Sequence, residues 1–116
     1  MGRKIGVKMK VVINNCYGGF FLSKAAYDYL GLAWDGVGIC TSPSNMEALG
    51  LPAETQDYDI SFRSLPKLVE CVEKLGDEAS GRFARLKIVE VPDNVEAIIE
   101  GRGGKEWVGE KHRVWE

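Results

Sequence analysis

Residues 14–20, in the order Asn-Asn-Cys-Tyr-Gly-Gly-Phe, carry the densest group of side chains able to bind or react. The two glycines lie between a predicted strand and a predicted helix. A glycine loop that opens onto a helix N-terminus exposes backbone N–H groups to an anion such as phosphate. Because the segment is neither a Walker loop nor a dinucleotide fingerprint, a tight turn with positive φ is the alternative. The ligand-binding candidates here are Asn14, Cys16, Tyr17, Gly18, Gly19 and Ser23.

Cys16 also offers a nucleophile. A thiol near a helix N-terminus can be activated, and His112, the only histidine of the chain, could serve as its base. The competing interpretation, which the sequence favours, is an inert buried thiol and a surface histidine. Three cysteines and one histidine also give a Cys₃His count. Their spacings of 24, 31 and 41 residues contain no zinc knuckle, so we expect no metal and no cofactor.

Charged residues suggest two further binding surfaces. In the C-terminal run 107–115, Arg113 can fork onto a phosphate or carboxylate, and Arg63 and His112 can join it and the glycine loop in holding a ligand. In the alternative, the tryptophans of this run cover the core and its charges form a solvated rim. No Lys or Arg occurs between residues 24 and 63, and this acidic section can steer a basic protein surface towards the chain.

The length and composition bound the class of protein. The chain has 116 residues, of which 45% are hydrophobic and 28% charged, and this suffices for one soluble domain with a single core. A net charge of −2 argues against general nucleic-acid binding, which needs a strongly basic face. No apolar run approaches the roughly 18 residues of a membrane span. Three widely spaced cysteines favour reduced thiols in a cytoplasm, and a homo-oligomer is left open.

The first half of the chain shows short periodic segments separated by glycines. Ser23 and Gly31 have the residue types that begin and end a helix. The predicted elements are a strand at 9–15, a helix at 24–30, a short strand at 32–40 and one or two helical turns from Pro43, in an otherwise irregular section 32–62.

The second half has clearer signals. Ser64 is the expected helix N-cap, and Pro66 fits only the first turn of the helix that follows. One face of this helix is apolar, with Leu68, Val69, Val72 and Leu75. Strands are predicted at 86–91 and at 95–100, with a hairpin-like loop at 101–104. The last segment, 105–116, is interpreted as a return strand through residue 108, with a terminal helix as the alternative. The order of elements predicts a single α+β domain over 9–116, with a largely antiparallel sheet and two main helices.

Four segments form a specific combination: the opening at 12–23, the section from Leu65-Pro66 to Phe83-Ala84, the strand at 86–93 and the ending Glu-Lys-His-Arg-Val-Trp at 110–115. Together they resemble a family of small uncharacterised proteins encoded by tailed phages and prophages. The resemblance covers residues 9–23 and 65–115. Family members usually begin near what is Met9 here, so residues 1–8 are interpreted as an N-terminal extension.

The resemblance implies a phage accessory protein that acts in the cytoplasm of a bacterial host. Such proteins often blunt host defences or redirect host machinery. We therefore expect a counter-defence or host-takeover factor that acts by binding, either to a host protein or to a small anionic, nucleotide-like ligand. The alternative is a cysteine-dependent enzyme with Cys16 as nucleophile and His112 as base.

Overall fold

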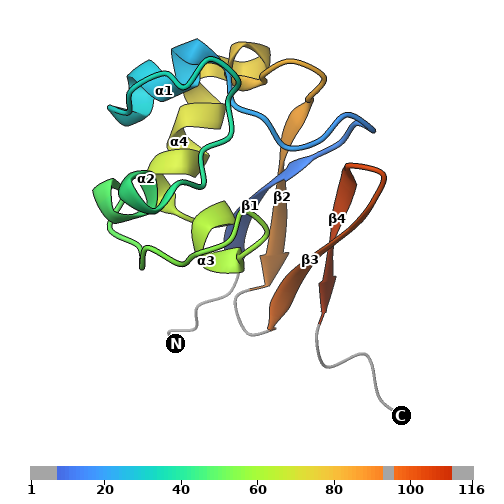
Figure 1. The fold of residues 1–116 in the computed structure, drawn as a ribbon. Helices are drawn as coiled ribbons and strands as arrows, with labels where there is room; N and C mark the ends of the chain where they lie inside the picture. Colours follow the sequence, from blue (N-terminus) through green and yellow to red (C-terminus); the bar gives the residue numbers. More distant parts are fainter. Residues whose placement is uncertain (1–7, 93–95, 111–116) are drawn as a thin grey trace.

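The computed structural model describes residues 8–92 and 96–110, and these fold as an α+β protein (Figure 1). The expected fold class is therefore confirmed. The elements in chain order are β1 (Lys8–Asn14), α1 (Lys24–Leu30), α2 (Pro43–Ala48), α3 (Ile60–Arg63), α4 (Pro66–Leu75), the 3₁₀ turn η1 (Gly76–Ala79), β2 (Leu86–Pro92), β3 (Ala97–Arg102) and β4 (Lys105–Glu110). Of the expected extension 1–8, only Lys8 is described, and it begins β1.

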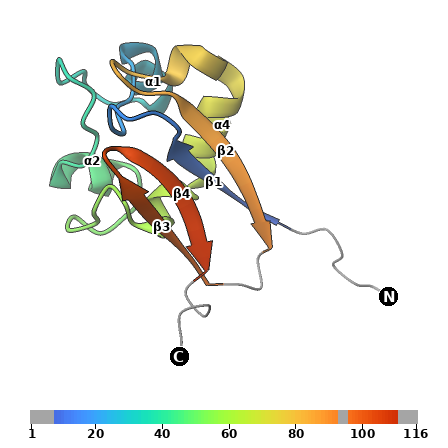
Figure 2. The same ribbon diagram turned by 90° about the vertical axis from the view of Figure 1, so that its right-hand side faces the viewer.

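The described strands pair antiparallel, as expected, but in two separate pairs. β1 pairs with β2, so that Val11 lies opposite Val89 and Val12 opposite Ile88. Successive strand residues point to opposite faces, yet Val11 and Val12 are both fully buried. Val12 belongs to the main core under the helices. The β3–β4 hairpin lies on the β1 side of the β1–β2 pair, where β4 contacts β1 (Figure 2).

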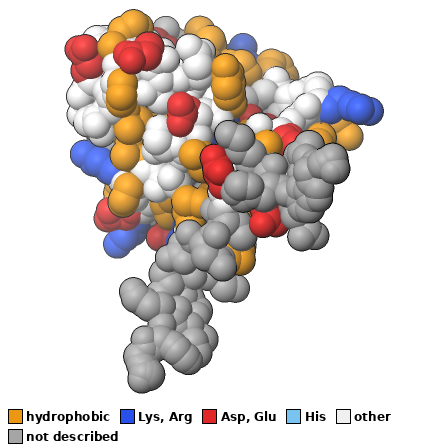
Figure 3. All heavy atoms as spheres, turned by 90° about the horizontal axis from the view of Figure 1, so that it is seen from below, with side chains coloured by type: hydrophobic (Ala, Val, Ile, Leu, Met, Phe, Trp, Pro, Cys, Tyr) orange, Lys and Arg blue, Asp and Glu red, His pale blue; other side chains and the backbone are white. Residues whose placement is uncertain are grey.

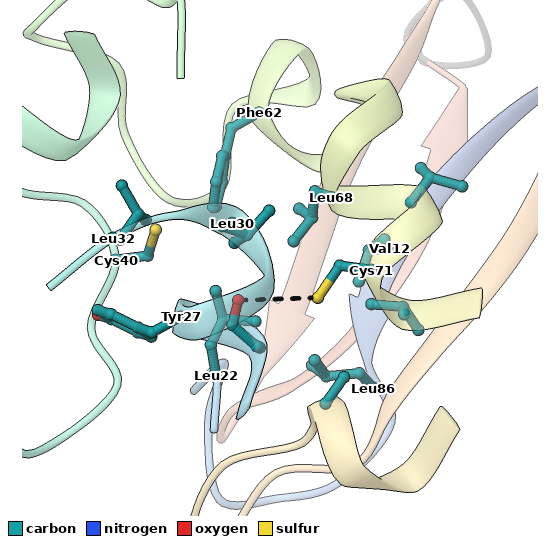
Figure 4. Close-up of a cluster of buried hydrophobic side chains, with 14 of the residues drawn as sticks. Val12, Leu22, Tyr27, Leu30, Leu32, Cys40, Phe62, Leu68, Cys71 and Leu86 are labelled. Carbon is teal, nitrogen blue, oxygen red and sulfur yellow. Dashed lines mark hydrogen bonds between the residues drawn. The ribbon is translucent and has the colours of Figure 1, made fainter. Parts of the chain in front are cut away.

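The main core lies where α4 packs against β1 and β2 and α1 packs against α4 (Figure 4). The predicted apolar face of α4 is confirmed, because Leu68, Val69 and Val72 are buried and Leu75 is partly buried in this cluster. The Cys71 thiol is fully buried on the same helix, 4.0 Å from the carbonyl oxygen of Ala26 in α1.

α1 has the ends that its sequence predicts. The Ser23 hydroxyl accepts a hydrogen bond from the Ala26 backbone N–H at 3.1 Å, which is the usual N-cap contact. Gly31 closes the helix with a φ of 76°, a backbone conformation that glycine adopts without strain. The helix thus spans the predicted residues 24–30.

The expected strand at 32–40 is wrong. The apolar residues on which it was predicted, Trp34, Val37 and Ile39, face solvent, with exposed fractions of 39%, 53% and 51%. Gly36 and Gly38 have φ values of 85° and 106°, which turn the chain out of an extended path. The spacing of the apolar residues therefore predicts a strand where the chain forms a tightly folded loop.

The helical content of the section 32–62 is higher than predicted. α2 begins at Pro43 as expected, but α3 was not anticipated. Ser64 is not the N-cap of α4. It ends α3 instead, and its hydroxyl donates to the Ile60 carbonyl at 2.6 Å. Leu65 takes the N-cap position, where its hydrocarbon side chain can accept no hydrogen bond, and Pro66 fixes the first helical residue.

One face of the molecule shows charged and apolar side chains mixed together (Figure 3). Where the chain is described, no helix is both long and apolar enough to cross a membrane. On the face drawn in Figure 3, Lys and Arg side chains stand among acidic and apolar ones instead of forming one basic surface.

Candidate functional site

Asn14 ends β1 and is fully buried. Its amide nitrogen donates to the carbonyl oxygens of Cys16 and Gly104, both at 2.7 Å. Its amide oxygen accepts from the Arg85 backbone N–H at 2.8 Å. These three bonds tie the start of the glycine loop to the β3–β4 turn and to the chain ahead of β2. Asn14 therefore organises the loop from within.

Arg63 is also fully buried, at the end of α3. Its two Nη atoms donate to the two carboxylate oxygens of Glu106 at 2.5 and 2.8 Å. Nη1 also donates to the Val12 carbonyl at 3.2 Å, and Nε donates to the Asp57 carbonyl. The guanidinium carbon lies 3.7 Å from the centre of the Phe20 ring. Every guanidinium nitrogen thus has a partner within the chain, and no surface of Arg63 is left for a ligand.

Glu106 joins these two sequence candidates. Besides binding Arg63, its carboxylate accepts from the Asn14 backbone N–H at 2.8 Å. The sequence did not single out Glu106, since an isolated acid in a predicted strand carries no signal of its own. The structure therefore brings Asn14 and Arg63 together, in a buried polar network that holds the hairpin against β1.

The glycine loop is packed between two turns. A Cβ atom on Gly18 would lie 1.8 Å from the Phe83 carbonyl oxygen, and one on Gly104 would lie 2.8 Å from the Gly19 nitrogen. Gly19 itself has a φ of 127°. These glycines allow a close approach of backbones, which fits the turn interpretation of the segment.

The other candidates of this region differ in their surroundings. Tyr17 is 71% exposed, with the Lys105 ammonium 5.5 Å from its ring centre. Cys16 is half-buried. The Ser23 hydroxyl caps α1 and donates to the Glu78 carbonyl at 2.5 Å. His112 and Arg113 lie outside the described residues, so the pairing of Cys16 with His112 stays a prediction.

The remaining two thiols are in the core. Burial, the largest cause, raises the pKa of Cys40 to about 12, and burial raises that of Cys71 to about 11. Both thiols are therefore protonated at neutral pH. Over residues 8–92 and 96–110, no group of three or more His, Cys, Asp or Glu side chains is placed to hold a metal ion.

A hollow of about 450 Å³ borders the glycine loop at Gly19 and Phe20 and extends along the β3–β4 hairpin. Its charged side chains are three acids and one cation, Arg102. One of the acids, Glu106, is neutralised by Arg63. The balance left by Asp57, Glu100 and Arg102 is negative, and such surroundings disfavour an anion.

A second cavity, of about 430 Å³, lies beside the start of α1 and was not predicted from the sequence. Three separate segments form it: residues 21–24, 34–37 and 80–83. We call it the α1 cleft. The side chains that determine its chemistry are Lys24, Trp34, Val37, Ser80, Arg82 and Phe83.

Asp35 fixes one wall of the α1 cleft. Its carboxylate accepts from the backbone N–H groups of Val37, Gly38 and Ile39 at 2.8, 2.6 and 3.1 Å, and from the Tyr27 hydroxyl at 3.0 Å. Partial burial, the largest single influence, would raise the pKa of Asp35. The hydrogen bonds together outweigh it and lower that pKa below its usual value. The loop that presents Trp34 and Val37 is therefore held from inside.

Trp34 is positioned by the same contacts. Its ring meets the Tyr27 ring edge-on, with centroids 5.0 Å apart and an interplanar angle of 87°. Tyr27 is fully buried, and burial raises the pKa of its hydroxyl, which therefore stays protonated and donates to Asp35. A rigid side chain thus holds Trp34 while leaving 39% of it exposed.

Phe83 forms the opposite wall. It is the third residue of a turn closed by a 3.1 Å hydrogen bond from the Ala84 N–H to the Gly81 carbonyl. Its φ is 63°, and no other non-glycine among the described residues has a positive φ. Turns with positive φ at this position favour Gly or Asn. Phe83 is also 70% exposed, so an aromatic side chain stands in water on a strained backbone.

Two cations border the α1 cleft. The Lys24 ammonium is 3.5 Å from the Asp28 carboxylate, with both side chains about two-thirds exposed, so this pairing is weak. The Arg82 guanidinium lies 5.9 Å from the centre of the Phe83 ring. The α1 cleft therefore combines aromatic walls with two positive charges.

Comparison of the chain with protein-family models, with curated proteins and with solved structures finds no match. The site is accordingly characterised by its own geometry.

Proposed function

We propose that the protein is an accessory binding protein of phage or prophage origin that works without catalysis and holds a small anionic ligand in the α1 cleft. The combination of segments that resembles the phage family supports the proposed origin, and with it action in the cytoplasm of a bacterial host. The binding role is carried by one observation, the conformation and exposure of Phe83 in the wall of the α1 cleft.

Phe83 costs the folded protein stability. An L-residue in the left-handed region loses on the order of 1 kcal/mol, and an exposed ring recovers little of this by burial. Natural sequences relax such positions readily when nothing depends on them, because Gly or Asn relieves the strain. Strained residues cluster where a protein contacts a ligand. A ring held in solvent at the mouth of a cleft fits that role.

The charges of the α1 cleft indicate the class of ligand. Lys24 and Arg82 favour an anion, and Trp34, Val37 and Phe83 favour an apolar or aromatic part of the same molecule. The alternative partner, a basic protein surface, has less support. Within the acidic section, the carboxylates of Asp35 and Asp59 already accept hydrogen bonds from backbone N–H groups of the chain itself. The small ligand is therefore the proposal that the geometry supports best.

Anilinonaphthalene sulfonate, an aromatic sulfonate whose fluorescence rises in apolar sites, tests this proposal. We expect the folded protein to bind one dye molecule, and Phe83→Ala to weaken that binding by roughly tenfold, the usual effect of deleting one stacking ring. Tyr58→Ala is the matched control, since Tyr58 is 60% exposed but lies away from the α1 cleft.

Melting curves of each variant would show that the dye reports on folded protein. Dye affinity that is equal in Phe83→Ala and in the unaltered protein would contradict the proposal, as would an equal loss in Tyr58→Ala.

A further inference from the structure

The α1 cleft presents a fixed aromatic surface next to two cations, and we propose that its ligand is a nucleoside monophosphate. The base would lie against Trp34 and Phe83, and the phosphate would bind Lys24 and Arg82. This inference rests on the proposed function and deepens it by naming the class of ligand.

The aromatic walls suit a planar base. Trp34 cannot rotate freely, because its ring packs edge-on against the buried Tyr27 and the loop behind it is closed by Asp35. Phe83 projects from a closed four-residue turn. A ring that is ordered before binding, as that of Trp34 is, loses little entropy on stacking with a base. Every base has a π face, so this surface favours nucleotides as a class over aliphatic anions.

The two cations suit a phosphate monoester. Among the described residues Lys24 is held only by an exposed pairing with Asp28, which a ligand can replace at little cost. In the described part of the chain, Arg82 makes no ion pair, and its guanidinium can offer two parallel N–H donors to phosphate oxygens. A phosphate monoester carries nearly two negative charges at neutral pH, matching two cations.

One further donor lines the α1 cleft. The Ser80 hydroxyl oxygen accepts from the Leu86 backbone N–H at 2.9 Å. A hydroxyl has one proton to donate besides its lone pairs. Within residues 8–92 and 96–110 the Ser80 hydroxyl donates to no partner, so its proton is available to a ligand. A polar donor beside stacked rings is what a base edge or a ribose hydroxyl requires.

The size of the α1 cleft favours a mononucleotide over a polymer. Its volume of about 430 Å³ falls at the lower end of the range for small-molecule sites. A nucleic-acid strand would also meet a protein of net charge −2, without the extended basic track that strands require.

Displacement of bound anilinonaphthalene sulfonate by AMP, GMP, CMP and UMP, each added alone, tests the inference. We expect at least one of them to displace the dye at micromolar concentration. Adenosine and ribose 5-phosphate, as separate halves of a nucleotide, should each bind at least about tenfold more weakly than the better nucleotides.

Two kinds of variant test the phosphate-binding and the base-binding parts of the site separately. Lys24→Gln and Arg82→Gln should each weaken nucleotide binding about tenfold while leaving adenosine binding unchanged. Trp34→Leu should weaken nucleotide and adenosine alike. Lys67→Gln removes an exposed cation from α4, outside the α1 cleft, and should change neither.

The outcomes separate this inference from the proposed function. If the dye binds in a Phe83-dependent way but none of the four nucleotides displaces it at about 1 mM, the nucleotide inference is wrong and the binding role stands. Nucleotide binding as strong in Arg82→Gln and in Lys24→Gln as in the unaltered protein would overturn it as well. Failure of the dye to bind at all would contradict both.

Discussion

At the scale of single residues, Phe83 is expected to lower the stability of the fold while contributing to ligand binding. Asn tolerates the left-handed region, whereas Phe does not, so Phe83→Asn should raise the free energy of unfolding by about 0.5–1 kcal/mol. Phe83→Ala is the control, because it removes the same ring but lacks the local side-chain hydrogen bonding that lets Asn adopt a positive φ. Urea denaturation measures both. A Phe83→Asn variant no more stable than Phe83→Ala would show that the turn stores no strain.

The Arg63–Glu106 pair ties β4 of the hairpin to the end of α3. Glu106→Leu would leave a fully buried guanidinium without its carboxylate, and we expect a loss of about 3–5 kcal/mol in the free energy of unfolding. Glu73→Ala is the matched control, since it breaks the 2.6 Å Lys10–Glu73 pair on the surface and should hardly move the denaturation midpoint. Equal effects of the two changes would mean that the buried pair does not hold the hairpin.

At the scale of elements, local signals predicted what local contacts determine. α1 was predicted from Ser23 and Gly31, which stand at its two ends, and the helix lies between them. α4 was predicted from Pro66 and an apolar face, and it begins at Pro66 and buries that face. The section 32–40 was predicted wrongly because its outcome depends on one side chain. Asp35 captures three backbone N–H groups that a strand would have offered to a neighbouring strand. The spacing of apolar residues does not show whether a side chain or a neighbouring strand will bind those N–H groups.

Asp35 also makes the wall of the α1 cleft depend on pH. A carboxyl whose pKa is lowered by folding stabilises the fold fully above its unfolded pKa, near 3.9, and loses that effect as the pH falls through the folded value. The stability difference between the unaltered protein and Asp35→Ala should therefore be constant from neutral pH to about 5 and shrink below about 4. Denaturant midpoints at each pH measure it.

Glu47→Ala, which removes an exposed acid from α2, provides the baseline for general acid effects. A difference between the unaltered protein and Asp35→Ala that stays constant down to pH 2.5 would mean that the four hydrogen bonds do not favour the charged carboxylate.

At the scale of the whole molecule, the binding site is a product of long-range packing. Gly38 and Gly81 both approach the Leu22 backbone, where an added Cβ would lie 2.2 and 2.8 Å from the Leu22 carbonyl oxygen. These contacts bring the 34–37 and 80–83 segments together at the start of α1. The sequence could therefore indicate candidate residues near Asn14, but not the α1 cleft, because nothing local relates Trp34 to Phe83.

The reactivity of the buried thiols measures how well the core is packed. Cys40 is 3% exposed and Cys71 is fully buried, on different segments of one core, whereas Cys16 is half-buried in the glycine loop. We expect an aromatic disulfide reagent at pH 8 to modify Cys16 in the native protein. Cys40 and Cys71 should react only with unfolded molecules, at rates that rise with urea as the unfolded fraction rises. Cys40 reacting as fast as Cys16 would show that the core opens locally.

The two core thiols also predict how the whole fold responds to alkali. Folding raises their pKa values from an ordinary value near 9 to about 12 for Cys40 and about 11 for Cys71. Above pH 9 the unfolded chain therefore binds fewer protons than the native one, and stability falls as the pH rises. A Cys40→Ala/Cys71→Ala variant should start less stable, because of the cavities, but lose less stability between pH 8.5 and 10.5. Parallel pH profiles for the two proteins, measured by urea denaturation, would mean that other groups cause the alkaline loss.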